Sequence, residues 1–162
     1  MRGKQNPIIY FVTLASLLIS SEGKAMGDVI LFSAIQGTVT HLGRPVSGAK
    51  LEREAQWKWG KKTVKDSVAT GADGKFSFSE IRRKMWLGQF LPHEPEISQL
   101  IVVRHGDKTY RAWVLDKRNY TANGELLYFD DNKGIIPYRD LSKPISIHCD
   151  LGAKEHRSGK VL

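Results

Sequence analysis

The sequence predicts an all-β protein, an antiparallel β-sandwich of about seven or eight strands. Polar and apolar residues alternate with a period of two along most of the chain, as in strands with one buried face. Glycine, asparagine and aspartate, which favour tight turns, separate the alternating runs. The chain has 162 residues, of which 41% are hydrophobic, and this composition allows one packed core and excludes a wholly disordered protein.

Residues 50–59 form the clearest predicted strand. Arg53 is the one charged residue on its otherwise apolar face, and the opposite face is polar. The apolar residues of that face are Leu51, Ala55, Trp57 and Trp59. Further strands are predicted by alternation, or by β-branched and aromatic residues, at residues 35–41, 63–69, 75–78, 97–104, 108–115, 125–129 and 145–151.

Short turn signals connect these runs, at residues 43–45, 73–74, 106–107 and 123–124. Gly106-Asp107 stands between two strong strands and predicts a two-residue hairpin turn. Residues 79–90 have no clear period, because their apolar residues are loosely spaced. This segment predicts either one short helix or an irregular crossover.

The first 25 residues have the layout of a secretory signal peptide. Arg2 and Lys4 give a positive start, residues 7–21 are apolar or small, and Ala25 follows at a position suited to cleavage. The alternative is an uncleaved membrane anchor, although the apolar run is shorter than the roughly 20 residues that span a bilayer as a helix. Cleavage after Ala25 predicts a periplasmic protein.

The chain has a single cysteine, Cys149, which excludes a disulfide within the chain and a lipid attached next to the signal peptide. Cys149 shares a predicted strand face with Ile145 and Ile147, and this pattern predicts a buried thiol rather than a nucleophile. Removal of the signal peptide leaves a predicted sandwich domain at residues 26–151 and a polar, basic tail at residues 152–162.

A pattern of glycine, proline and apolar residues marks the first half of the domain. It reads GTV at residues 37–39, GRPVSGAKL at residues 43–51 and TGADGKFSF at residues 70–78. This pattern resembles the opening of carboxypeptidase regulatory-like, transthyretin-like domains. The resemblance covers residues 35–78; it implies the same β-sandwich fold and carries no information about activity.

Short segments of the second half resemble a narrower group. They are LPHEP at residues 91–95, VRHG at 103–106, YRAW at 110–113, KRNY at 117–120 and NGEL at 123–126. Together they resemble an uncharacterised family of small bacterial proteins, a domain of unknown function whose stand-alone members lie near secretion-system effectors. The resemblance implies an immunity protein that inhibits a secreted antibacterial effector, for example a type VI secretion lipase.

Basic and aromatic residues gather in several loops of this chain, whose formal net charge is +8. Such residues are common in protein–protein hot spots, and complementary charge speeds association with an acidic surface. Export makes nucleic acid a poor partner, so an acidic protein partner is predicted; the alternative is that the tryptophans are core and the lysines a solvated rim. The candidate partner-binding residues are Trp57, Lys58, Trp59, Lys61, Lys62, Arg82, Arg83, Lys84, Trp86, His93, Glu94, Arg118 and Tyr120.

No catalytic residue, metal site or cofactor is predicted, because the histidines have none of the spacings that mark such sites. The predicted function is therefore non-catalytic protein binding. One alternative is a transthyretin-like hydrolase of the hydroxyisourate hydrolase type, although residues 155–159 do not match the C-terminal Tyr-Arg-Gly-Ser motif of those enzymes. Another alternative is a structural or carbohydrate-binding module of the envelope.

Overall fold

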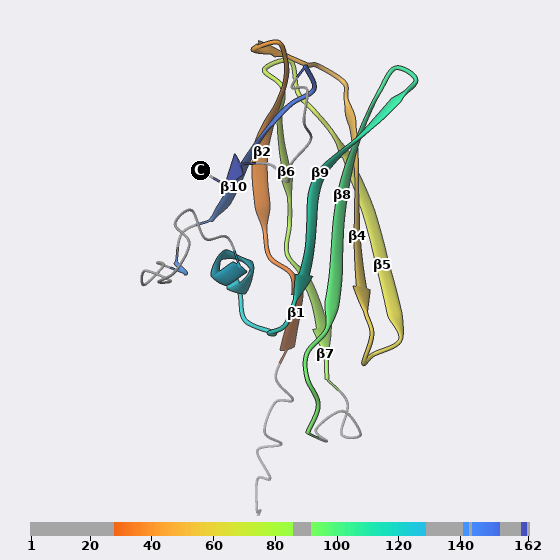
Figure 1. Cartoon of the computed structure of the whole chain (residues 1–162), viewed down its shortest axis with the longest axis vertical. Coiled ribbons are helices and arrows are strands. Elements are labelled where there is room, and N and C mark those ends of the chain that lie inside the picture. The colour runs from red at the N-terminus through yellow and green to blue at the C-terminus, as the bar shows by residue number, and fades with distance from the viewer. Residues whose placement is uncertain (1–27, 86–91, 129–140, 143, 153–159, 162) are drawn as a thin grey trace, which may run out of the picture.

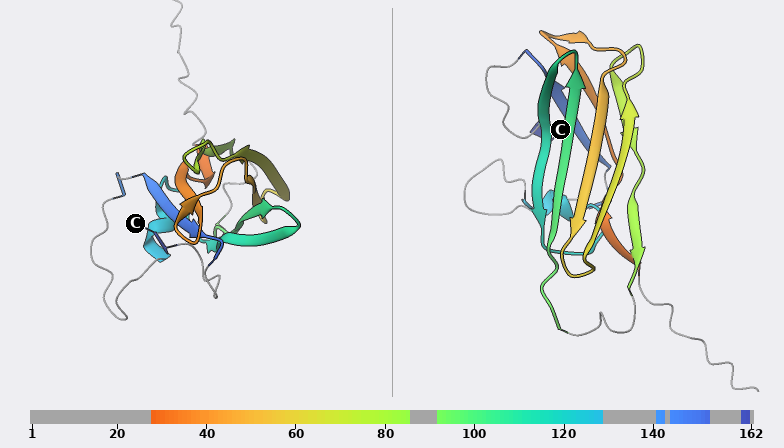
Figure 2. Two further views of the ribbon diagram at one scale, coloured as in Figure 1. Left: turned by 90° about the horizontal axis from the view of Figure 1, so that it is seen from above. Right: turned by 90° about the vertical axis from the view of Figure 1, so that its right-hand side faces the viewer.

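The computed structural model describes residues 28–85, 92–128, 141–142, 144–152 and 160–161. It confirms an all-β sandwich, since the regular elements in these residues are strands apart from the short 3-10 helix η2, Gly124–Tyr128. Two larger sheets share one core, and a separate strand pair lies at one end (Figures 1 and 2). The predicted signal peptide and most of the predicted tail lie outside the described residues.

The first large sheet has the strand order β5-β4-β8-β9 and is antiparallel throughout. Along β4 and the first part of β8, every second residue is buried, as the alternation predicts. His105 pairs with Lys108 across Gly106-Asp107, which confirms the predicted hairpin. The four strands are β4 (Lys50–Trp57), β5 (Lys62–Ala69), β8 (Ile97–His105) and β9 (Lys108–Lys117).

The second large sheet is built around β2 (Ile35–His41). Here β10 pairs with β2 in parallel, with Ile145 opposite Ile35, which differs from the purely antiparallel arrangement that the sequence predicts. The difference arises because the chain returns to this sheet by a long crossover after β9 and not by a hairpin. The other strands are β3 (Arg44–Pro45), β6 (Lys75–Phe78), β10 (Ile145–Asp150) and β11 (Lys160–Val161), the last within the predicted tail.

Strands β1 (Asp28–Phe32) and β7 (Ile81–Lys84) form a separate antiparallel pair. The sequence does not predict β1, and its prediction of a short helix or irregular crossover is wrong for β7. Only Ile81 of β7 is buried, and the following three residues are exposed cations. The sequence of β7 therefore lacks the alternation of polar and apolar residues by which a strand is recognised. Both strands lie at the end of the sandwich where β4 turns into β5 (Figure 2).

The strand predicted at residues 125–129 is also wrong, because η2 begins at Gly124. Asn123 has a left-handed backbone with φ of 54°, which ends the extended conformation. Gly124 packs so tightly that an added Cβ would lie 1.9 Å from Oδ1 of Asn119. The helix then directs Glu125 and Leu126 into the protein.

The core between the sheets is apolar and aromatic, with ring pairs Phe32–Trp113 and Phe76–Phe78 at centroid separations of 5.9 and 6.0 Å. Cys149 is buried in it, as predicted. The core residues from the second sheet include Ile35, Val39, Ile145 and Ile147.

Arg53, the exception on the apolar face of β4, is buried with the rest of that face. Its guanidinium carbon lies 4.5 Å from the centre of the Phe78 ring and 5.0 Å from that of Phe32. Asp66 of β5 accepts hydrogen bonds from Nε at 2.9 Å and from Nη2 at 2.6 Å. The arginine therefore ties the edge strand to the core through one bidentate ion pair.

Candidate interaction site

The β4–β5 hairpin carries the two tryptophans of the predicted site, and the structure separates their roles. Trp57 is the last residue of β4 and is buried, whereas Trp59 lies in the turn and is 37% exposed, so the predicted strand ends two residues early. An added Cβ on Gly60 would lie 2.0 Å from the Trp57 ring. The turn therefore folds back onto Trp57, and this close approach requires glycine.

Four of the predicted site residues form one connected aromatic cluster, which we call the aromatic end: Trp57, Trp59, His93 and Tyr120. The rings of Trp59 and His93 stack with centroids 4.2 Å apart and planes within 5°. The Tyr120 hydroxyl lies 2.7 Å from His93 Nε2 and accepts a hydrogen bond of 3.0 Å from Trp57 Nε1. Each ring is thus held by a partner, and only Trp59 offers much surface.

The hydroxyl that joins this cluster stays protonated over the ordinary pH range. Burial raises the pKa of Tyr120, and the hydrogen bond from Trp57 offsets only part of that effect. A neutral phenol can accept one hydrogen bond and donate another, so Tyr120 links Trp57 to the imidazole of His93.

Cations surround the aromatic end. Lys58 pairs with Glu96, while Lys61 and Lys62 are exposed and form no ion pair within the described part of the chain. Lys61 has a left-handed backbone with φ of 47°, at the tip of the hairpin. Glu94, in the loop before β8, is exposed too. The predicted residues of the hairpin are therefore available to a partner, except for the buried Trp57.

The other predicted cations lie on neighbouring strands. Arg82 pairs with Glu80 and, at 3.5 Å, with Asp28, whereas Arg83 and Lys84 are exposed without an acidic partner among the described residues. Trp86 lies outside the described residues. Figure 2 shows the end of β7 beside the β4–β5 hairpin, so the basic residues share one end of the sandwich.

Arg118, exposed after β9, completes the predicted set. Arg118 is the first residue of the connection between β9 and η2. This connection is attached to β1, because the Ile30 N–H donates a hydrogen bond to the Tyr120 carbonyl at 3.1 Å. Through Tyr120 the same segment reaches the aromatic end. The β9–η2 connection is therefore part of this end of the molecule.

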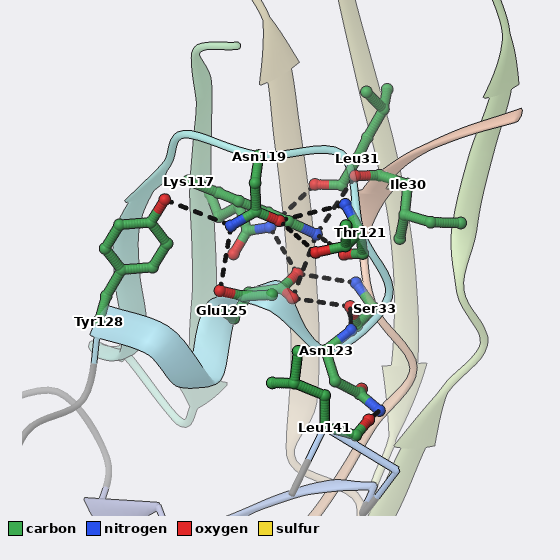
Figure 3. A network of polar contacts seen from close by, with 12 residues as sticks. Ile30, Leu31, Ser33, Lys117, Asn119, Thr121, Asn123, Glu125, Tyr128 and Leu141 are labelled. Atoms are coloured by element: carbon green, nitrogen blue, oxygen red, sulfur yellow. Dashed lines mark hydrogen bonds and ion pairs between the residues drawn. The ribbon is translucent and has the colours of Figure 1, made fainter. Parts of the chain in front are cut away.

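A buried polar network lies directly behind this segment, and the sequence does not predict it (Figure 3). Lys117 Nζ lies 3.2 Å from Glu125 Oε2 and donates to the carbonyls of Ile30 and Thr121 at 3.2 and 2.8 Å. Glu125 also accepts from the Ser33 N–H and hydroxyl at 2.9 and 2.7 Å. Ile30 and Ser33 come from a part of the chain distant from Lys117 and Glu125, so no local spacing could reveal the whole network.

Gln99 extends the network into the core. Its amide nitrogen donates to Glu125 at 2.9 Å and to the Leu31 carbonyl at 2.8 Å, and its oxygen accepts from Trp113 at 3.0 Å. Burial alone would raise the pKa of Glu125, but the charge of Lys117 and these hydrogen bonds hold that pKa below its usual range. Burial also lowers the pKa of Lys117, which the attraction of Glu125 offsets only in part.

Cys149 is poorly placed to act as a nucleophile. Burial, followed by the charge of Asp150, raises the pKa of Cys149 to about 11, so its thiolate is scarce at neutral pH. His148 lies on the opposite face of β10, where its Nε2 is 3.2 Å from the Thr40 hydroxyl. Within the described residues, no three His, Cys, Asp or Glu side chains gather as a metal site.

A separate hollow of about 530 Å³ lies on the outer face of the four-stranded sheet. Its charges pair with one another: Lys50 and Arg104 both contact Glu52, and Lys65 contacts Glu54. None of the predicted partner-binding residues lines it. Each carboxylate that lines this hollow is therefore already paired with a cation of the same sheet, in contrast to the exposed cations at the aromatic end that form no ion pair within the described residues.

Comparison with known proteins identifies one sequence family, described as a domain of unknown function (DUF6795), which matches residues 35–154. No curated protein and no solved structure matches the chain. The resemblance of residues 35–78 to transthyretin-like domains stays a prediction. Among the described residues, no helix has the length and apolar character needed to cross a membrane.

Proposed function

Because the chain belongs to the DUF6795 family, a domain of unknown function, we propose a role for it from its geometry: an exported, non-catalytic domain that binds a protein through its aromatic end. The observation that supports this most strongly is Trp59. Its ring is 37% exposed, yet it is stacked on His93 in a cluster closed by Tyr120. An aromatic side chain that is ordered before binding loses little entropy when a partner covers it.

The charges around Trp59 support an acidic partner. Lys61, Lys62, Arg83 and Lys84 are exposed and lack an ion pair within the described residues. Such unpaired cations at the rim of a binding surface increase the rate of association with a negatively charged protein. The mechanism is occlusion, in which Trp59 fills a depression on the partner and the cations lie over carboxylates around it.

Within this class, the leading candidate is an immunity protein that covers the active site of a secreted antibacterial effector in the periplasm, with a type VI secretion lipase as the first effector to test. This narrower role and the periplasmic location rest on the family resemblance and on the signal-peptide layout of residues 1–25. The aromatic end supplies a surface of suitable chemistry for an acidic active-site rim.

The binding proposal is tested by affinity capture of the tagged chain from periplasm, followed by identification and purification of the captured protein. Trp59→Ala should weaken the purified complex by at least about thirty-fold, the effect of losing a hot-spot side chain worth about 2 kcal/mol. Val114→Ala is the control, because Val114 is 50% exposed on the outer face of the four-stranded sheet and touches none of the residues of the aromatic end in the described contacts. Equal affinity of both variants and the parent would overturn the proposal.

The immunity role has its own test. The product of the neighbouring gene is exported to the periplasm of a test strain with and without the present chain, and growth is measured. Rescue by the parent chain but not by a Lys61→Glu, Lys62→Glu double variant is expected. If the neighbouring gene encodes no toxic protein, or if rescue does not depend on complex formation, the immunity role is wrong while general protein binding still stands.

A further inference from the structure

We infer that the docking surface continues from Trp59 onto η2, where it takes apolar side chains of the same partner, and that the buried Lys117–Glu125 pair fixes the two halves relative to each other. The inference rests on the proposed function for its partner. Its geometry comes from contacts that the sequence does not predict.

The outer side of η2 presents an apolar pair. Leu127 is 40% exposed and Tyr128 is 39% exposed, while Glu125 and Leu126 on the inner side are buried. Large apolar side chains with this much exposure are few among the described residues, and Trp59 is another of them. Contiguous exposed apolar surface is where a protein partner can gain apolar contacts, and these two side chains supply such surface beside the aromatic end.

Tyr128 is held in place before any partner arrives. Its hydroxyl accepts hydrogen bonds from the Arg118 N–H at 2.9 Å and from Asn119 Nδ2 at 3.3 Å. The Arg118 side chain is exposed and forms no ion pair within the described residues. The η2 half therefore repeats the composition of the Trp59 half, an ordered aromatic ring beside an unpaired cation.

One short segment connects the two halves. Tyr120 contacts Trp57 and His93 at the aromatic end, and Arg118, two residues earlier, contacts Tyr128 of η2. Lys117 fixes both sides of this segment, because its ammonium group donates to the carbonyl of Thr121 and pairs with Glu125 of η2. Figure 3 shows Lys117 between Thr121 and Glu125, with Tyr128 at the end of η2. The buried pair is thus a common anchor for the segment that carries Tyr120 and for Tyr128.

The chemistry of the partner follows from these two halves. Each half offers an apolar ring and a cation, so the complementary surface carries apolar side chains flanked by carboxylates. A uniformly acidic surface would leave Leu127 and Tyr128 without apolar contacts. A uniformly apolar surface would bury Arg118 without a counter-ion, which is costly.

Site-specific photocross-linking tests the extent of the surface in living cells that encode the protein. The photoreactive amino acid p-benzoylphenylalanine replaces Lys58, which is exposed beside Trp59, or Leu127 or, as the control, Val114. None of these three side chains is part of the buried network, and Trp59 is kept, so both the fold and the central contact should be retained. We expect an adduct with the same acidic protein from positions 58 and 127, and none from position 114.

The other outcomes separate the inference from the proposed function. An adduct from position 58 without one from position 127, or with a different protein at each, overturns the continuation onto η2 and leaves the proposed function standing. No adduct at either position, or equal adducts at all three, overturns both.

Hydrogen exchange tests the anchoring role without any partner. The double variant Lys117→Met, Glu125→Gln removes both charges and keeps the side-chain volumes close to the originals. We expect amide exchange at residues 118–128 to become at least tenfold faster while the amides of β4 and β8 keep their rates. Uniform acceleration throughout the domain would show that the pair only adds stability, and would overturn this part of the inference. Arg104→Met with Glu52→Gln, an exposed pair, is the matched control.

Discussion

Lys117 and Glu125 form an ion pair with no exposed surface: Nζ lies 3.2 Å from Oε2, and both side chains have 0% exposure. Removing two charges from water is unfavourable, and such a pair persists only when other hydrogen bonds complete its surroundings. Ser33, Gln99 and two backbone carbonyls supply those bonds. The pair therefore specifies how β1, β9 and η2 meet, in addition to any stability it adds.

Loss of one member of this pair should be severe. Lys117→Met is expected to lower the free energy of unfolding by about 3–5 kcal/mol, because Glu125 is left as an uncompensated buried charge. Glu125→Gln should also destabilise the protein, and the double variant should lose less than the sum of the two, because no charge then remains buried. Urea unfolding of the four proteins measures this coupling, and strictly additive losses would contradict it.

Arg53 offers a contrasting case, because it is buried while its partner Asp66 is at an exposed edge. Asp66→Asn should cost about 1–3 kcal/mol by weakening the one ion pair that the buried guanidinium forms with the described part of the chain. Arg53→Met should be close to neutral, since Nη1 has no hydrogen-bond partner among the described residues and a methionine would fit between the rings of Phe32 and Phe78. Thermal unfolding compares the two variants, and a larger loss for Arg53→Met would contradict this account.

Gly60 determines how the hairpin turn meets Trp57. Gly60→Ala places a methyl group at 2.0 Å from the ring, so the turn must move, and a loss of about 1–3 kcal/mol is expected from overpacking. The fluorescence of the tryptophans should change as well, because Trp59 follows the turn. Gly71→Ala is the control, since its added Cβ would lie no closer than 3.2 Å to another atom, the Asp73 Oδ1, and 3.9 Å from the Lys75 carbonyl oxygen. Unchanged fluorescence in Gly60→Ala would count against the close packing.

Cys149 should make stability depend on alkaline pH. Its pKa in the folded protein is raised to about 11 from 9.0, so folding favours the protonated thiol. That contribution is fully present below pH 9 and is lost as the pH rises through about 11. The fall in unfolding free energy between pH 8 and pH 11 should therefore be smaller in Cys149→Ala than in the parent, a comparison in which the other titrating groups cancel. Identical slopes would contradict the buried-thiol account.

The fold could be predicted from the sequence wherever one face of a strand is buried and the other is exposed to solvent. Alternation revealed β4 and β8, and glycine turns located the hairpin between β8 and β9. Alternation failed for β7, where three exposed cations follow one buried residue. It also failed for η2, where residues with strand-like composition form a 3-10 helix that buries Glu125. In both places the conformation depends on tertiary partners and not on local pattern.

The candidate site could be predicted in composition but not in arrangement. Basic and aromatic neighbours pointed to Trp59 and His93, yet only the fold shows that these two rings stack and that Trp57 belongs to the core. The η2 surface and its buried anchor were missed, because Lys117 and Glu125 form no recognisable motif and their partner Ser33 lies 92 residues from Glu125 in the chain.

The parallel pairing of β2 with β10 also sets an order of assembly. The neighbours of β2 that come early in the chain, β3 and β6, can join it soon after synthesis, whereas its partner β10 is made near the end. Contacts between such distant segments form late in folding because a long loop must close first. Until Ile145 reaches Ile35, the nascent domain carries an open apolar strand edge, so chain synthesis or transport that stalls before β10 leaves a species prone to wrong strand pairing.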